Sequence, residues 1–146
     1  MVMKGTTMEC LRHYLGTLPN DQKLVREARQ PFCDYVRCTH EVAMSWVRKR
    51  REPVSIHLIL VRLFLQDHGY DVKELERANP LIMRCNRAIA EGVTTIERVH
   101  EALGYSQVSD VYRSLQHSKT PLPERMARLK RHLDEVFPDK GFPEDP

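Results

Sequence analysis

Two stretches of this chain repeat one plan at an offset of about 68 residues: a short helix, a tight turn, a second helix, a proline and a long amphipathic helix. The small and apolar residues around the turn are Phe32, Cys33, Val36, Ala43 and Trp46 in the first stretch and Val99, Leu103, Gly104, Val111 and Leu115 in the second. Beyond the turn the aligned pairs are Pro53 with Pro121, Leu58 with Met126, Val61 with Leu129 and Leu65 with Leu133. Because self-similarity at a fixed offset tests one structural hypothesis twice, the repeat predicts two related helical units.

Hydrophobic periodicity indicates the fold class. Apolar residues recur at three- and four-residue steps almost throughout the chain, and strand signals are nearly absent. We therefore predict an all-α fold of about nine helices, with two helix-turn-helix units packed around a central apolar helix at 54–68. The expected order is an N-terminal helix in 1–19, a first unit in 20–78, a second unit in 79–137 and a flexible tail in 138–146.

Local signals predict where individual helices begin. Pro31 suits the first turn of a helix, so we expect a new, short helix from Pro31 to about Arg37. Thr39 can cap the helix that follows it. Thr94 and Glu97 have the spacing of a capping box, which would begin a helix of the second unit at that point.

Composition narrows the class of protein. Apolar residues make up 41% of the chain and charged residues 29%, as in ordinary packed soluble proteins. The longest apolar run, 56–65, is too short to span a bilayer, and the amino end shows no secretory leader, so we expect a cytoplasmic protein. A net charge of +3 and a pI near 8.7 are compatible with a nucleic-acid partner without demanding one.

Neither a metal site nor a catalytic site is predicted. The four cysteines are scattered through predicted helices and are expected to be reduced, buried thiols. Cys33, Cys38 and His40 lack a fourth ligand at metal-site spacing, which argues against zinc. The sequence contains no glycine-rich phosphate loop, no nucleophile elbow and no helical histidine pair, so we expect neither an enzyme nor a cofactor.

The turn of the first repeat has the residue types that a helix-turn-helix requires. Cys33 supplies the small residue needed where the second helix crosses the first, and Ala43 and Trp46 supply the apolar residues that face back into the core. The segment 24–65 resembles the repressor-like helix-turn-helix family of the Cro and Xre type. The run TVSRWL that is common in that family corresponds here to VAMSWV at 42–47.

The two repeats depart from this family in different ways. Arg37 stands at the turn position that the family usually fills with glycine. The second repeat keeps the glycine, as Gly104, but has one extra turn residue before Val111 and Ser114 in place of Trp46. It therefore resembles the family more loosely than the first repeat does.

The resemblance implies binding of double-stranded DNA, with the second helix of the first unit in the major groove. Arg48 is the best candidate for a base contact, because its guanidinium can bind guanine or phosphate. Lys49, Arg50 and Arg51 complete a cationic block and are assigned to phosphates. The full outward set of that helix is Thr39, His40, Glu41, Met44, Ser45 and Arg48.

A matching outward set is expected in the second unit. Gln107 can pair bidentately with adenine. Lys119 and Arg125 would contact phosphates, which Asp110 would repel. The residues of this set on the reading helix are Ser106, Gln107, Ser109, Asp110 and Arg113.

We therefore predict a sequence-specific double-stranded DNA-binding protein that acts as a small transcriptional regulator. The tandem units could span two adjacent major-groove faces, or a homodimer could form with Met8, Leu11 and Leu15, or the final helix, at its seam. The alternative is an all-helical protein–protein adaptor in which the repeat is only a scaffold. RNA is a third candidate partner; no membrane or small-molecule partner is expected.

Overall fold

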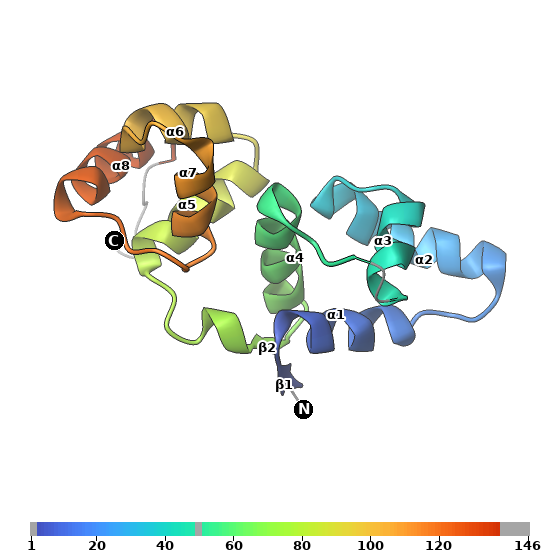
Figure 1. Cartoon of the computed structure of the whole chain (residues 1–146). Coiled ribbons are helices and arrows are strands. Elements are labelled where there is room, and N and C mark those ends of the chain that lie inside the picture. The colour runs from blue at the N-terminus through green and yellow to red at the C-terminus, as the bar shows by residue number, and fades with distance from the viewer. Residues whose placement is uncertain (1–2, 49–50, 138–146) are drawn as a thin grey trace, which may run out of the picture. The chain divides into compact units, whose positions relative to one another are not determined.

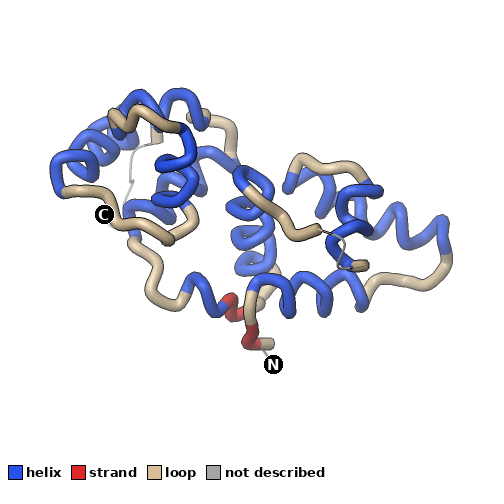
Figure 2. The backbone as a smooth tube through the Cα atoms, viewed as in Figure 1, coloured by secondary structure: helices blue, strands red, loops and turns tan. Residues whose placement is uncertain are grey.

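The computed structural model describes residues 3–48 and 51–137, and the chain divides into two compact units, Met1–Arg77 and Ala78–Pro146 (Figure 1). The described residues form eight α-helices, one 3-10 helix and a two-stranded parallel pair (Figure 2), which confirms the all-α prediction. The first unit contains β1 (Lys4–Gly5), α1 (Thr7–Gly16), α2 (Gln22–Val36), α3 (His40–Val47), α4 (Ser55–Asp67), β2 (Asp71–Val72) and the 3-10 helix η1 (Lys73–Leu75). The second contains α5 (Pro80–Ala90), α6 (Ile96–Leu103), α7 (Val108–Leu115) and α8 (Pro123–Val136).

Aromatic rings from four helices form the core of the first unit. The ring of Phe32 on α2 lies edge-on to Phe64 of α4, with centroids 5.1 Å apart. Trp46 of α3 lies 6.4 Å from Phe32, and Tyr14 of α1 lies 5.1 Å from Phe64. Edge-to-face pairs at these separations add about 0.5–1.5 kcal/mol each beyond the burial of their surface. The cluster therefore fixes α2 and α3 against α1 and α4.

The apolar helix α4 is a core element of the first unit. Six of its residues are buried, and it packs against α1 and α2. At 13 residues it is shorter than a bilayer crossing requires, and no other helix in the described ranges combines the necessary length and apolar character.

The N-terminal segment belongs to the same core. β1 pairs with β2 in parallel, with Lys4 opposite Asp71. Leu11 is fully buried and Leu15 is 8% exposed, while Met8 is half-buried. Leu11 and Leu15 therefore cannot form the homodimer seam that the sequence suggested, because their side chains are already enclosed within the unit.

The helix break expected at Pro31 does not occur. α2 runs without interruption from Gln22 to Val36, with Pro31 inside it. An interior proline removes one backbone hydrogen bond and costs about 3 kcal/mol. Pro31 itself is exposed, whereas Phe32 and Val36 that follow it are fully buried, and their burial offsets the cost of the lost bond. The prediction was wrong because it considered the proline without the packing of the residues behind it.

The turn between α2 and α3 is built as the repeat predicts. Arg37 ends α2 in the left-handed conformation, with φ 65°, and its N–H donates to the carbonyl of Cys33. Thr39 is confirmed as the cap of α3, since its hydroxyl accepts a hydrogen bond from the N–H of Val42 at 3.1 Å. A non-glycine residue therefore occupies the position at which glycine is usual.

The second unit repeats this turn with one residue more. Gly104 ends α6 in the left-handed conformation, with φ 77°, and α7 begins four residues later at Val108. In the first unit the interval from Arg37 to the start of α3 at His40 is three residues. The buried residues that hold α5 to α8 together are aliphatic or small and include Ile82, Cys85, Ile89, Val99, Leu103, Val111, Leu115, Leu129 and Leu133.

The cap residue of α6 lies one position later in the chain than the sequence predicts. Thr95, not Thr94, is the cap, and its hydroxyl accepts from the N–H of Arg98 at 3.2 Å. Thr94 is 3% exposed, and its hydroxyl lies 2.7 Å from Nε2 of His132 on α8. The hydroxyl of Thr94, which the sequence assigned to the helix cap, makes a long-range hydrogen bond to α8 instead.

The cysteines are free, and three of the four are buried; Cys38 is half-buried. Burial raises the pKa of Cys38 and of Cys85 to about 12. Because the thiolate is the reactive form, both thiols are poor nucleophiles at neutral pH.

We expect Gly104→Ala to destabilise the protein by about 1–2 kcal/mol, because alanine pays a steric penalty in the left-handed region. An added Cβ would also lie 2.5 Å from Nη1 of Arg128, which would have to move. Gly16→Ala is the matched control, since nothing lies within 4 Å of its Cβ position and no positive φ is required. Urea unfolding followed by circular dichroism measures both; equal stability of the two variants would contradict the strain at Gly104.

Candidate nucleic-acid interface

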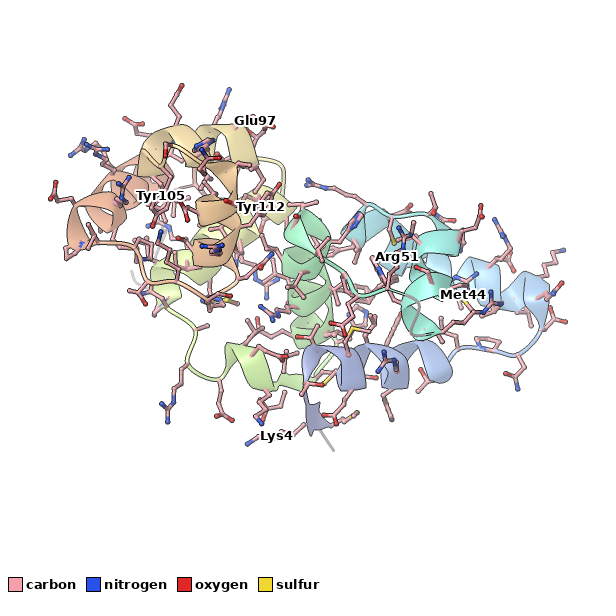
Figure 3. All side chains as sticks on the ribbon, viewed as in Figure 1. Lys4, Met44, Arg51, Glu97, Tyr105 and Tyr112 are labelled. Atoms are coloured by element: carbon pink, nitrogen blue, oxygen red, sulfur yellow. The ribbon has the colours of Figure 1, made fainter. Side chains whose placement is uncertain are left out.

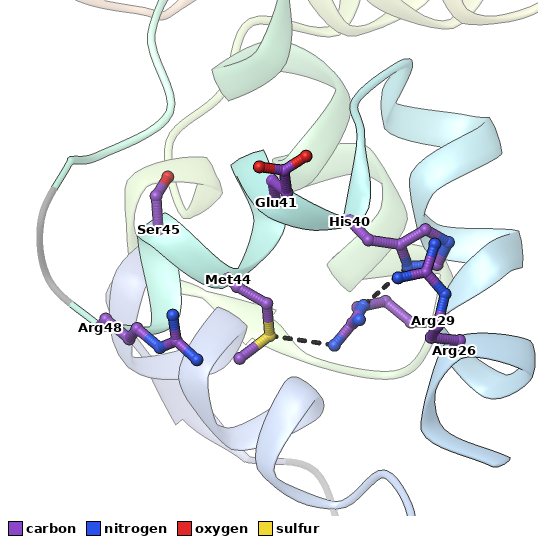
Figure 4. Close-up of a pocket in the computed structure, with 7 residues that line it drawn as sticks. All are labelled: Arg26, Arg29, His40, Glu41, Met44, Ser45 and Arg48. Carbon is purple, nitrogen blue, oxygen red and sulfur yellow. Dashed lines mark hydrogen bonds between the residues drawn. The ribbon is translucent and has the colours of Figure 1, made fainter. Parts of the chain in front are cut away.

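The helix α3 turns one side to the core and the other outward. Its buried residues are Ala43 and Trp46. The outward side, together with α2, surrounds a hollow of about 340 Å³ (Figure 4). The residues that line this hollow are Arg26 and Arg29 from α2, and His40, Glu41, Met44, Ser45 and Arg48 from α3 and its C-terminal end. The structure thus brings five of the residues predicted for DNA contact to one place.

Arg29 is the central cation of this hollow. Its side chain is nearly enclosed, with the residue 7% exposed. Its Nε donates to Nδ1 of His40 at 2.9 Å, and its Nη1 contacts the sulfur of Met44 at 2.9 Å (Figure 4). No carboxylate of the described residues lies within ion-pair distance of it, although buried arginines are rarely found without a partner. The hollow therefore carries positive charge that the described residues do not neutralise.

A chain of hydrogen bonds determines the protonation state of His40. Because Arg29 donates to Nδ1, that nitrogen is unprotonated, and the Nε2–H donates to Oε1 of Gln30 at 2.9 Å. Gln30 in turn donates to Asp34 at 2.7 Å. Burial lowers the pKa of His40, and the neighbouring charges of Arg26 and Arg29 lower it further against the opposing effect of Asp34.

Several of the predicted reading residues already use their polar atoms within the protein. The hydroxyl of Thr39 caps α3, and the hydroxyl of Ser45 donates to the carbonyl of Val42 at 2.6 Å. His40 is held by Arg29 and Gln30 as described above. Within the described residues, Glu41 and Arg48 make no side-chain hydrogen bond or ion pair and are exposed. These two side chains are the ones free to reach a ligand from α3.

The cationic block beyond α3 is described only in part. Arg51 is exposed in the first unit, in the segment that leads to α4 (Figure 3). Lys49 and Arg50, which the sequence assigns to phosphates, lie outside the described residues.

In the second unit, the positive charges near α7, the helix predicted to contact bases, are paired with a carboxylate. Ser106, Gln107 and Ser109 are exposed as predicted sites require. However, Nη1 of Arg113 lies 3.8 Å from Asp110, and Nζ of Lys119 lies 3.1 Å from the same carboxylate oxygen. The positive charges assigned to DNA contact on this side are therefore partly offset by a carboxylate.

Arg125 also has a structural role in the second unit. Its Nη1 donates to the carbonyl of Leu103 at 2.8 Å, and its guanidinium lies 4.3 Å from the ring centre of Tyr105. The ammonium of Lys119 lies 4.7 Å from the same ring, which Figure 3 labels. Arg125 thus closes the C-terminal end of α6 and holds the turn that follows.

The sequence interpretation did not include Arg26 and Arg29. The two residues are three apart on one helix and so share a face. This spacing is visible in the sequence and could have identified Arg26 and Arg29 as a pair of cations on one helix face. The break expected at Pro31 placed them on a different helix from the one that precedes the turn, so their position opposite α3 was not inferred.

Comparison with protein-family models, with curated protein sequences and with solved structures finds no match for this chain.

We expect His40 to make the stability of the protein fall as the solution is acidified. Its pKa in the folded state lies below the ordinary value of 6.5, so unfolding takes up a proton between the two values. The stabilising contribution of neutral His40 is present above about pH 6.5 and is lost as the pH falls through the pKa of the folded state. His40→Gln keeps an acceptor for Arg29 without a titrating group. Urea unfolding between pH 5 and 7 should therefore show a steeper loss in the wild type than in the variant; parallel profiles would rule out this contribution.

Proposed function

We propose that this protein binds double-stranded DNA through the α2–α3 face of the first unit, with α3 in the major groove. The observation that carries the proposal is the buried guanidinium of Arg29, which has no carboxylate partner among the described residues, with Arg26 and Arg48 lining the same hollow. The three arginines outnumber Glu41, the one carboxylate that lines this hollow, so a polyanion can supply the remaining negative charge. Phosphate contacts dominate the affinity of proteins for DNA.

The proposal assigns distinct roles to the residues of this face. Arg26 holds a phosphate, which sets the register of the protein without reading sequence, and the enclosed Arg29 adds positive charge behind it. Arg48 reads a base, because its guanidinium fork matches the O6 and N7 acceptors of guanine. Glu41 accepts a hydrogen bond from the amino group of a cytosine. The cationic segment 49–51 contacts the adjoining backbone.

One side of α3 is accessible while its other side packs against the core, and the accessible side supports this assignment. The major groove is wide enough for one α-helix, and α3 buries only Ala43 and Trp46 of its eight residues. Base contacts from so few free side chains indicate a short recognition sequence. Regulation of transcription is the role that we propose for a protein of this kind.

The first test removes two free cations from the hollow. We expect Arg26→Gln/Arg48→Gln to weaken binding of a fluorescent duplex by about tenfold or more at low salt, because each arginine contacts one phosphate or base. Fluorescence anisotropy across a salt series should show the slope of log Kobs against log[salt] reduced by about 2 if both contacts are to phosphates, and by about 1 if Arg48 reads a base.

The matched control removes the same charge from places where it is already paired. Lys4 lies 3.3 Å from Glu76, and Lys130 lies 2.9 Å from Asp134. Lys4→Gln/Lys130→Gln should leave the salt slope nearly unchanged. If the two double variants behave alike, the α2–α3 face does not bind DNA, and the protein–protein adaptor becomes the preferred function.

The second test concerns sequence reading. We expect Glu41→Ala to broaden the set of sequences recovered when binding sites are selected from random duplexes, because one base loses its hydrogen-bond acceptor, worth about 1–3 kcal/mol of discrimination. The same variant should bind non-specific DNA more tightly, since it removes a negative charge from the interface. Unchanged selectivity would exclude Glu41 from base reading.

A further inference from the structure

The helices α6 and α8 of the second unit enclose an open hollow of about 560 Å³. Three arginines line it: Arg98 from α6, and Arg128 and Arg131 from α8. We call these three residues the α6–α8 arginine face. Glu101 and Glu135 line the same hollow, but neither approaches an arginine within the 4 Å of an ion pair.

The three arginines are exposed, and their side chains have no hydrogen-bond or ion-pair partner among the described residues. Other cations of this unit do find carboxylates, because Lys130 and Arg84 each lie 2.9 Å from Asp134. The α6–α8 arginine face thus gathers free positive charge on a unit where paired charges are also present.

Helix-dipole and capping interactions do not account for the positions of these arginines. Arg98 lies in the first turn of α6, where the partial positive charge of the helix end disfavours a cation. Arg128 lies over the opposite end of α6, beside Gly104. There Arg125 already donates to the carbonyl of Leu103, so the end of the helix is capped without Arg128. Arg98 thus opposes its local electrostatics without an ion-pair partner among the described residues, and such local conflicts are expected at functional sites.

We propose that the α6–α8 arginine face binds the phosphodiester backbone of DNA. The identity of this ligand rests on the proposed function of the first unit. Arg128 and Arg131 lie three residues apart, a rise of about 4.5 Å along the helix. Residues at this spacing are neighbours on one face of the helix, so both long side chains can reach the same DNA strand. Guanidinium forks bind phosphate oxygens bidentately, so a row of them suits a backbone better than a single anion.

This assignment changes the surface through which the second unit acts. The sequence placed its phosphate contacts at Lys119 and Arg125 and its base contacts within residues 106–113. In the structure Asp110 engages both Lys119 and Arg113, whereas the cations of the α6–α8 arginine face are unengaged. The second unit then adds affinity that does not depend on sequence, and the reading of bases falls to the first unit.

The test compares Arg128→Gln/Arg131→Gln with the control Lys4→Gln/Lys130→Gln, in which Lys130 lies on the same helix and is paired with Asp134. Both are made in the full chain, and circular dichroism verifies that each folds. Anisotropy with 24-base-pair duplexes should show the salt slope reduced by about 2 in the arginine variant, with equal losses of affinity on all sequences. A slope and an affinity equal to those of the control would overturn the proposal.

A measurement on the wild type avoids any effect of substitution on folding. Phenylglyoxal modifies accessible arginines, and mass spectrometry reports which ones. Bound duplex should protect Arg128 and Arg131 several-fold, while the exposed Arg77, outside both faces, should react at its free rate. Equal reaction of Arg128 and Arg131 with and without DNA would also overturn the proposal.

Comparing the two arginine double variants distinguishes this proposal from the proposed function of the first unit. Loss of binding in Arg128→Gln/Arg131→Gln, with Arg26→Gln/Arg48→Gln unaffected, would support the α6–α8 arginine face and refute the α2–α3 face. The reverse result would refute the α6–α8 arginine face alone. If both variants match the control, both proposals fail.

Discussion

One left-handed residue at the end of the first helix of each turn governs the rest of the structure. Arg37 and Gly104 reverse the chain at equivalent places, and the N–H of each bonds back to a carbonyl four residues earlier. The direction of α3 and of α7 follows from that reversal. A non-glycine residue there costs about 1–2 kcal/mol. In the first unit this cost is offset by the packing of Phe32 against Trp46. These two buried residues lie on either side of the turn and hold the two helices together.

The two units share this geometry but differ in where their positive charge is free. In the first unit the unpaired cations face the hollow between α2 and α3, around Arg29. In the second, Asp110 engages the cations near α7, and the unpaired arginines lie on α6 and α8. One scaffold thus supports two distributions of charge, because surface residues can change without disturbing the buried contacts that the repeat preserves.

Sequence reasoning succeeded where the controlling interaction is local. The periodicity of apolar residues predicted the all-α fold, and the repeat predicted the turn at Arg37 and the longer turn after Gly104. It failed where distant packing overrode a local signal. Pro31 has the chemistry of a helix start, but the burial of Phe32 behind it keeps α2 continuous. Thr94 has the chemistry of a cap, but its hydroxyl is taken by a histidine 38 residues away.

The sequence by itself determined the all-α fold class and the two turns, because backbone preference and hydrophobic period act over a few residues. Only the tertiary structure decided which of the charged residues are free. An ion pair needs an approach of about 4 Å, and the packing of whole helices sets that distance. Arg84 therefore meets Asp134 across 50 residues, while Arg29 is enclosed beside His40 and no carboxylate in the described part of the chain is in reach.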